Sequence, residues 1–330
     1  MRKKITALAF IASSVLLCAC AAKNEVIEIS SAETAPKESA MAPLEENTDK
    51  TAEESTEAKA ERPENTAVYS EAESLFTQEI YQDDQKKLSL PYNLFLPADY
   101  KSEKSYPLVV FLADKEVHGD DPAEVLYQDG ALVWASPEEQ EVRECIVLAP
   151  QYTKELEQSL GDLLPPDKEW SEGLDLIYAL IRETMEKYSI DAARIYGTGQ
   201  GDGACAILAL RFKYPELFAA EYLVGPQCAS FDLSALKNDK IWVSVSQGDE
   251  PSYGMMNQAL ETWKSLGVPV SQGEPLNPAD SLSFDLILEN MKNAEATLKY
   301  TVFSEGDFHS LCKVAYTVDG IRSWLFAQSK

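Results

Sequence analysis

A glycine-rich turn at residues 197–204, with the sequence GTGQGDGA, carries the pattern most suggestive of chemistry in this 330-residue chain. It lies between a predicted strand and a predicted helix, where backbone N–H groups can hold an anion. Gly199, Gly201 and Ala204 fit the G-x-G-x-x-G/A pattern of dinucleotide-binding turns. Asp202, however, would bring a negative charge to the helix N-terminus that a pyrophosphate needs. No acidic residue stands clearly at the end of the next strand, so we do not favour a dinucleotide site.

Apolar runs and periodicities predict strands alternating with helices around this turn. Runs typical of strands buried on both faces occur at residues 108–112, 145–149, 194–198, 219–224, 241–245 and 298–303. Helical periodicity marks residues 171–188, 202–214, 255–266 and a single closing helix through 314–325, and residues 75–96 favour a hairpin. This alternation predicts an α/β fold, with a mostly parallel sheet covered by helices on both faces, in one domain over residues 74–330.

The same turn also fits the nucleophile-elbow frame G-x-S-x-G, with Gly199 and Gly203 at its outer positions. Further strings agree in order with one family, at residues 90–97, 106–107, 134–138, 149–151, 194–196, 214–220 and 324–328. Over about residues 75–330 the chain thereby resembles exported bacterial α/β-hydrolases similar to feruloyl esterases, polyhydroxybutyrate depolymerases and predicted peptidases. The resemblance implies the α/β-hydrolase fold. The sequence departs from the family at the nucleophilic serine, whose place is taken by Gly201.

The resemblance also implies positions for the rest of a catalytic site, in chain order after the nucleophile position. The acid falls on Asp249, just past a predicted strand, and the histidine on His309, in the loop before the closing helix. A turn aspartate and a structural histidine are the alternatives. Backbone N–H groups at Ala113 and Asp202 are the implied oxyanion-hole donors. His118 is expected to be a surface residue.

Two departures argue against ordinary ester hydrolysis. Gly201 has no hydroxyl, so no acyl-enzyme can form there, and Ala113-Asp114 stands where many relatives carry His-Gly. Asp114 and Asp202 would add negative charge where an oxyanion develops. Glycine adopts the strained dihedrals of an elbow easily, so loss of the serine is tolerable and Gly201→Ser is expected to restore some turnover. Cys205, about one turn into the next helix, should face the packing rather than a substrate.

The first 73 residues are predicted to export and tether the domain. Residues 1–19 combine a basic start with a short apolar run, as signal peptides do. They end in LCAC, which resembles the bacterial lipobox and implies cleavage before Cys20 and acylation of its thiol. Residues 20–73 are acidic and nearly free of aromatic side chains, which predicts a disordered tether. We therefore expect an extracytoplasmic protein, anchored by lipid to the membrane of a bacterial cell envelope. An ordinary signal peptide and an uncleaved anchor are the alternatives.

Composition excludes several classes of partner. The net charge is −26, of which −20 belongs to residues 74–330, whereas nucleic-acid binding needs clustered Lys and Arg. Only two histidines are present, with neither an HExxH motif nor paired CxxC motifs, so no metal and no cofactor is expected. Export permits disulfides among Cys145, Cys205, Cys228 and Cys312, but Cys145 and Cys205 lie in apolar elements and are predicted to be buried thiols.

Three functions stay open at this point. The first is a degenerate esterase that binds a ligand or partner. The second is an active hydrolase of carboxylic esters (feruloyl or acetyl type) or of peptides, with a non-standard nucleophile. The third is a structural surface lipoprotein. Trp134, Tyr152 and Trp170 fall in predicted loops, where they would either border a pocket or pack in the core. A small ester, phenolic or carbohydrate ligand would suit the first two functions.

Overall fold

The computed structural model describes residues 70–160, 163, 170–228, 236–280, 284, 288–289, 291–292 and 295–330. Residues 1–69, which hold the predicted signal peptide, Cys20 and most of the predicted tether, lie outside this part of the chain. The last four residues of the predicted tether form the short helix α1 (Ser70–Glu73), and Ala72 in it is buried. Among the described residues, no helix combines the length and apolarity that a membrane span requires.

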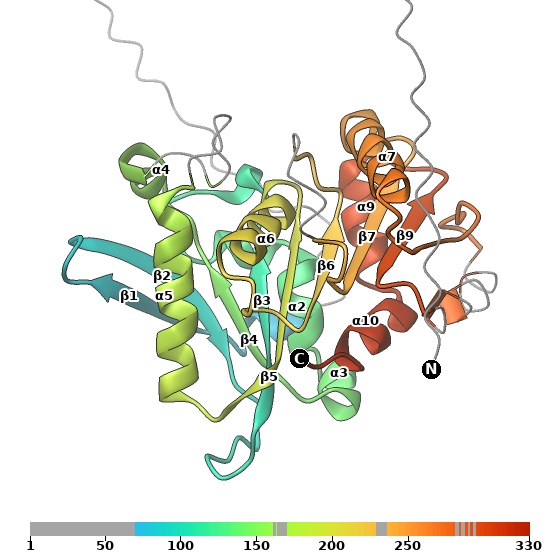
Figure 1. The fold of residues 1–330 in the computed structure, drawn as a ribbon. Coiled ribbons are helices and arrows are strands. Elements are labelled where there is room, and N and C mark those ends of the chain that lie inside the picture. Colours follow the sequence, from blue (N-terminus) through green and yellow to red (C-terminus); the bar gives the residue numbers. More distant parts are fainter. Residues whose placement is uncertain are drawn as a thin grey trace, which may run out of the picture. The chain divides into compact units, whose positions relative to one another are not determined.

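The described residues form a nine-stranded sheet in the order β1-β2-β4-β3-β5-β6-β7-β9-β8 (Figure 1). The strands are β1 (Thr77–Asp83), β2 (Leu88–Phe95), β3 (Tyr106–Leu112), β4 (Ile146–Pro150), β5 (Ile190–Gln200), β6 (Ala220–Val224), β7 (Ile241–Ser246), β8 (Val270–Gln272) and β9 (Leu298–Phe303). β1 and β2 form an antiparallel hairpin and β2 pairs antiparallel with β4, whereas the other pairings are parallel. The predicted α/β fold with a mostly parallel sheet is confirmed.

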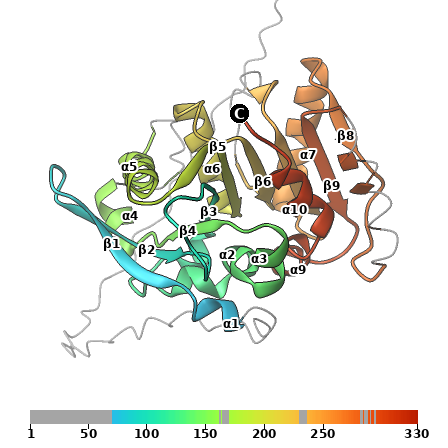
Figure 2. The same cartoon turned by 90° about the horizontal axis from the view of Figure 1, so that it is seen from below.

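Helices cover both faces of the sheet (Figure 2). One face carries α4 (Lys154–Leu160), α5 (Glu172–Lys187), α6 (Asp202–Lys213) and α7 (Glu250–Ser265). The other carries α1, α2 (Asp129–Leu132), α3 (Pro137–Val142), α9 (Phe308–Ala315), α10 (Asp319–Phe326) and the 3-10 helices η2 (Lys115–Val117), η3 (Glu124–Tyr127) and η4 (Val133–Ala135). Along β3, Leu108 and Val110 point into the first core while Val109 and Phe111 point into the second. That division explains why the run is continuously apolar.

The C-terminal segment departs from the sequence expectation of one closing helix. α9 and α10 are separate, because the chain leaves the helical conformation at Val318, whose backbone is extended. The break allows Tyr316, Val318 and Ile321 all to be buried, whereas three side chains at that spacing cannot share one face of a continuous helix. The Tyr316 ring packs edge-on against Phe111.

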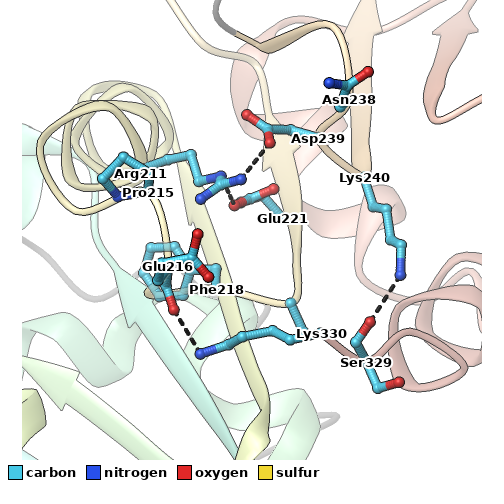
Figure 3. A pocket seen from close by; sticks show the side chains of 11 residues that line it. Arg211, Pro215, Glu216, Phe218, Glu221, Asn238, Asp239, Lys240, Ser329 and Lys330 are labelled. Carbon is cyan, nitrogen blue, oxygen red and sulfur yellow. Dashed lines mark hydrogen bonds and ion pairs between the residues drawn. The ribbon is translucent and has the colours of Figure 1, made fainter.

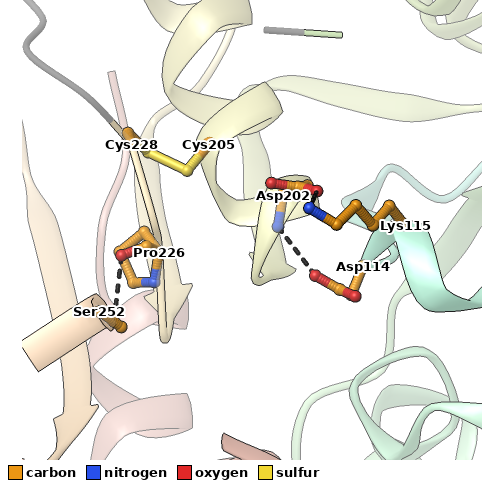
Figure 4. The surroundings of a disulfide bond; sticks show 7 residues. All are labelled: Asp114, Lys115, Asp202, Cys205, Pro226, Cys228 and Ser252. Atoms are coloured by element: carbon orange, nitrogen blue, oxygen red, sulfur yellow. Dashed lines mark hydrogen bonds and ion pairs between the residues drawn. A yellow bond between two sulfur atoms is a disulfide. The ribbon is translucent and has the colours of Figure 1, made fainter. Parts of the chain in front are cut away.

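Two further expectations about single residues are wrong. The side chain of His118 is only 8% exposed, and its Nδ1 lies 2.7 Å from Glu157 Oε1. Its ring packs against Tyr152, so it is an interior residue rather than a surface one. Cys205 is buried as predicted, but it forms a disulfide with Cys228 that ties the start of α6 to the segment after β6 (Figure 4).

The structure also tests the expectations for Cys145 and for the three aromatic residues in predicted loops. Cys145 is a buried free thiol, as is Cys312. Trp134 is fully buried, and its indole N–H donates to the Gly130 carbonyl at 2.9 Å, so it belongs to the core. Tyr152 is nearly buried and Trp170 is about one-third exposed, stacked on Phe212.

A buried charged cluster lies at the amino end of β6. Glu221 is flanked by Gly197 of β5 and Ile241 of β7, and its side chain is 1% exposed. Arg211, in the last turn of α6, places Nε 3.4 Å from Glu221 Oε1 and also hydrogen-bonds Asp239 (Figure 3). Burial raises the pKa of Glu221 to about 8, against the opposing effect of Arg211 and with a further rise from Asp239. Burying an ionised carboxylate without hydrogen bonds is costly, which explains why the pKa of Glu221 is raised rather than lowered.

This raised pKa predicts how stability changes with pH. Between about pH 4.5 and pH 8 the folded protein holds a proton on Glu221 that the unfolded chain has lost, so the free energy of unfolding must fall as pH rises through that window. Glu221→Gln removes the effect. We expect the wild type to lose on the order of 3 kcal/mol more stability than the variant between pH 5 and pH 8, measured by urea denaturation. Parallel pH profiles would contradict the prediction.

Candidate functional site

The predicted elbow forms a sharp turn between β5 and α6. Gly201 has φ of 56° and ψ of −124°, in the left-handed half of backbone space that side-chain-bearing residues seldom occupy. Its N–H donates to the Val224 carbonyl at 3.0 Å, and its carbonyl accepts from Cys205 N–H at 3.3 Å. The turn therefore has a backbone conformation that glycine adopts with little strain.

The outer glycines of the frame are required by close contact. A Cβ on Gly199 would lie 2.7 Å from the Leu112 carbonyl oxygen, and one on Gly203 would lie 2.1 Å from the same atom. The end of β3 thus packs directly on the backbone of the turn. This contact brings the residues after β3, beginning with Ala113 and Asp114, beside the elbow.

Asp114 fills the space in front of Gly201. A Cβ built on Gly201 would lie 1.8 Å from Asp114 Oδ2 and 2.8 Å from Cγ. The carboxyl group therefore occupies the place where the side chain of an elbow nucleophile would begin. Asp114 is only 6% exposed. Its position is fixed by two backbone amides, since Oδ1 accepts from Glu116 N–H at 3.0 Å and Oδ2 from Asp202 N–H at 3.1 Å.

The two predicted oxyanion-hole residues, Ala113 and Asp202, lie beside Gly201, but the Asp114 carboxylate already occupies the space next to them. Asp202 N–H already donates to Asp114, as Figure 4 shows. Ala113 lies just beyond the end of β3, buried, and its carbonyl oxygen would be 2.5 Å from a Cβ on Gly203. Lys115 Nζ lies 3.2 Å from the Asp202 carboxylate, which offsets part of the negative charge. Before the carbonyl oxygen of a substrate could accept a hydrogen bond from Asp202 N–H, it would have to displace the Asp114 carboxylate.

The side chain of the predicted histidine is mostly exposed to solvent. His309 is 63% exposed, and its Nε2 lies 3.0 Å from Glu116 Oε2. The preceding residue takes the inner position, because Phe308 Cζ would lie 3.0 Å from a Cβ on Gly201 and its ring also faces Gly225. The last loop thus presents a hydrocarbon ring to the turn instead of a base.

The predicted acid is buried and not engaged with the histidine. Asp249 follows β7 at the start of α7, is 4% exposed, and has no hydrogen-bond partner for Oδ2. Burial raises the pKa of Asp249, and the charge of Asp307 acts in the same direction. No hydrogen bond joins the carboxyl of Asp249 to the imidazole of His309. Their loops do meet, since Ser246 Oγ donates to the Glu305 carbonyl at 3.0 Å.

Neither nearby cysteine supplies a thiolate in place of the missing serine. Cys205 is consumed by its disulfide. Cys312 is buried in α9, and burial raises its pKa well above the usual range, with Asp114 and Asp249 adding to the rise. A thiol held in its neutral form is a poor nucleophile. Within the part of the chain that the structure describes, no group of three His, Cys, Asp or Glu side chains is arranged to hold a metal ion.

The structure therefore brings together Gly201, Asp202, Ala113 and Asp114, whereas no hydrogen bond joins the side chains of His309 and Asp249 to them or to each other. The arrangement presents a fixed carboxylate, which accepts hydrogen bonds but donates none. Sequence reasoning noticed the charge of Asp114 but missed that it fills the elbow, and it missed Phe308. A glycine at position 201 together with an acidic residue just after β3 is the sequence signal that would have indicated the position of Asp114.

Comparison with known proteins supports this description at the level of the fold. No protein-family model and no curated protein matches the sequence. Among solved structures, a thermostable esterase is similar with a TM-score of 0.64 and 25% identity, over 78% of this chain and 64% of that one. The present chain thus spans less than two thirds of that esterase.

Two other solved structures share the fold at lower identity. A ferulic acid esterase has a TM-score of 0.52 and 13% identity, over 76% of this chain and 98% of its own. Dipeptidyl peptidase 4 of Porphyromonas gingivalis has a TM-score of 0.52 and 12% identity, over 77% of this chain and 35% of its own. With the strand order and the turn at Gly201, the likeness to the thermostable esterase identifies the chain as a member of the α/β-hydrolase superfamily.

Proposed function

We propose that this protein is a degenerate esterase, a member of the superfamily that binds a ligand or a partner instead of cleaving an ester. The observation that carries the proposal is the Asp114 carboxylate, held by two amides in the place of the nucleophile's side chain. With Gly201 in the turn, the site lacks a hydroxyl, a free oxyanion donor at Asp202 and an inward-facing histidine. Each of these is needed for acyl transfer by a serine esterase.

The chemistry of Asp114 narrows the ligand that such a site would take. A carboxylate attracts hydroxyl or N–H donors and repels the carbonyl oxygen of an ester. Of the ligand classes expected from the sequence, a phenolic compound or a carbohydrate therefore suits the site better than a simple ester. Glu116 and His309, both more than half exposed, would form the rim that such a ligand meets first.

One observation favours a second candidate, an active hydrolase with a non-standard nucleophile. The Asp114 carboxylate lies where a nucleophile would, and its attack on an acyl carbon would expel the alcohol and leave a mixed anhydride for water to cleave. Against it, both carboxylate oxygens accept amide hydrogen bonds, and His309 is turned toward Glu116. We therefore rank binding above catalysis.

The two candidates predict opposite results in a hydrolysis assay. We expect the full-length protein to cleave p-nitrophenyl acetate and methyl ferulate no faster than buffer, because the elbow at Gly201 provides no hydroxyl or thiolate nucleophile. His309→Ala should behave in the same way. The assay is the release of p-nitrophenol or ferulate, with a serine esterase as positive control. Turnover that Asp114→Asn abolishes would establish the second candidate and overturn the first.

The steric conflict at the elbow revises the expectation that Gly201→Ser restores turnover. The new Cβ would overlap Asp114, so the single variant should lose about 1–3 kcal/mol of stability and stay inactive. Adding Asp114→Ala removes the overlapping atoms and frees Asp202 N–H. We expect the double variant to be at least ~1 kcal/mol more stable than the sum of the two single changes predicts, by urea denaturation. Strict additivity would show that Asp114 does not fill this space.

We further propose that Cys20 carries the lipid anchor of an extracytoplasmic envelope protein. The proposal rests on the basic start, the apolar run and the LCAC string of residues 17–20. In a bacterial host grown with an alkyne-tagged fatty acid, the wild type should be labelled and should sediment with membranes. Cys20→Ser should lose both properties, whereas the matched control Cys18→Ser should keep both. Equal labelling of the Cys20 variant would refute the assignment.

A further inference from the structure

The strand β1 forms one edge of the sheet, and among the described residues no strand pairs with its outer side. Figure 2 shows the hairpin of β1 and β2 projecting from the rest of the domain. Edge strands usually carry features that prevent pairing with another chain, such as lysine, proline, a bulge or a very short length. β1 has none of these four, because its seven residues, TQEIYQD, pair with β2 in an uninterrupted register. The strand β8 at the opposite edge has only three residues.

The backbone of β1 directs hydrogen-bonding groups to this open side. Ile80 lies opposite Pro91 of β2, which has no N–H to donate. The Pro91 carbonyl points the other way, since it accepts from Gln151 N–H at 2.8 Å. In an antiparallel pair, residues at such a position turn their N–H and C=O groups away from each other. The backbone groups of Ile80 therefore face outward, and the two-residue alternation extends this to Gln78 and Gln82.

The side chains of these three residues are exposed and uncharged. Ile80, in the middle of the strand, is 61% exposed, and Gln78 and Gln82 on either side of it are also exposed. All three lie on the same face of the sheet, because side chains alternate along a strand. A large exposed aliphatic side chain beside an open edge is the arrangement that favours addition of another strand.

The sequence of β1 is complementary to itself in the antiparallel direction. If a second copy pairs with β1 about a two-fold axis at Ile80, the two Ile80 side chains lie opposite each other. Gln78 then lies opposite Gln82 of the second copy, so neutral amides face neutral amides. The outward backbone groups of the two strands meet in this register and can form up to about six hydrogen bonds. The register thus satisfies the open edge and covers Ile80 at the same time.

The other face of β1 carries two acidic residues, and this register keeps them from facing each other directly. Glu79 lies opposite Tyr81 of the second copy, and Asp83 lies opposite Thr77. The two Glu79 carboxylates come into diagonal positions, but each is already paired with Lys187 of its own chain, whose Nζ lies 2.7 Å from Oε2. Like charges directly opposite would be destabilising, and the register avoids them.

We propose that two copies of this chain associate through their β1 strands, antiparallel and centred on Ile80, into one continuous sheet. The contact is isologous, so it uses both β1 edges and closes at two copies. The occupant of the edge is a second copy rather than an unrelated extended peptide, because charge and polarity match position by position when the strand meets itself. The dimer does not depend on the state of the elbow, since no residue of β1 belongs to that site.

Sedimentation velocity of the full-length protein in detergent tests the association. We expect the wild type to dimerise, and Ile80→Lys should weaken the dimer about tenfold or more, because two ammonium groups would face each other. Val142→Lys is the matched control, since Val142 is an aliphatic residue of α3 that is 70% exposed, and it should dimerise like the wild type. A wild type that stays monomeric at about 100 μM, or a dimer that persists unchanged in Ile80→Lys, would overturn the proposal.

Disulfide trapping on membranes tests the register. In the proposed pairing the Cα atoms of opposite residues lie about 5.5 Å apart, within the span of a disulfide. Ile80→Cys should therefore cross-link to itself under mild oxidation, whereas Val142→Cys should not. Gln78→Cys and Gln82→Cys should each stay uncrosslinked alone and cross-link when the two variants are co-expressed, because identical positions lie about 13 Å apart along the strands. Cross-linking of Gln78→Cys to itself, or none in the co-expressed pair, would refute the register. Non-reducing gels are the measurement.

Discussion

The hydrogen bond from Asp202 N–H to the Asp114 carboxylate is the contact on which the chemistry of the elbow depends. It joins the segment after β3 to the first residue of α6, and the close packing of Gly199 and Gly203 on Leu112 makes that approach possible. In an active hydrolase the same amide N–H would be free to donate a hydrogen bond to the oxyanion that develops in the transition state. Here it is satisfied in the resting protein by an anion that is part of the chain.

Gly201 and Asp114 are therefore best understood as a matched pair. A side chain at position 201 would collide with the carboxylate, and the carboxylate at position 114 would lose one of its two amide donors without Asp202 N–H of the turn. Glycine at position 201 therefore leaves room for the Asp114 carboxylate, and the turn that contains this glycine supplies an amide donor to it. Glycine also removes the strain of a positive φ, so stability at this turn rises as nucleophilic capacity disappears. That direction is the one expected when an active-site residue is replaced by a more comfortable one.

Most of the fold could be predicted from sequence because burial on two faces produces long apolar runs, as in β3, and because Ser171 caps α5 with its side chain. The edge strand β8 escaped because its three residues are only partly covered. The division of α9 from α10 could not be predicted from the sequence, because it follows from the burial of Tyr316, which is a tertiary contact. At the site, motif spacing located the turn at Gly201. It could not reveal that Asp114 fills it or that His309 faces Glu116, since both depend on contacts between segments far apart in the sequence.

Charge is distributed differently at the two ends of the strands, and this difference bears on function. Around the elbow, Asp114, Asp202 and Asp249 concentrate negative charge where an acyl-transfer transition state would also be negative, and Lys115 offsets only part of it. At the opposite end, Arg211, Lys240 and Lys330 gather near the acids Glu221 and Asp239. A domain of strongly negative net charge attracts few anions by long-range forces, so specific recognition of an anion must rest on short-range, desolvated contacts. In the function that we propose, the rigid sheet keeps its role as a frame for binding although the elbow carries no catalysis.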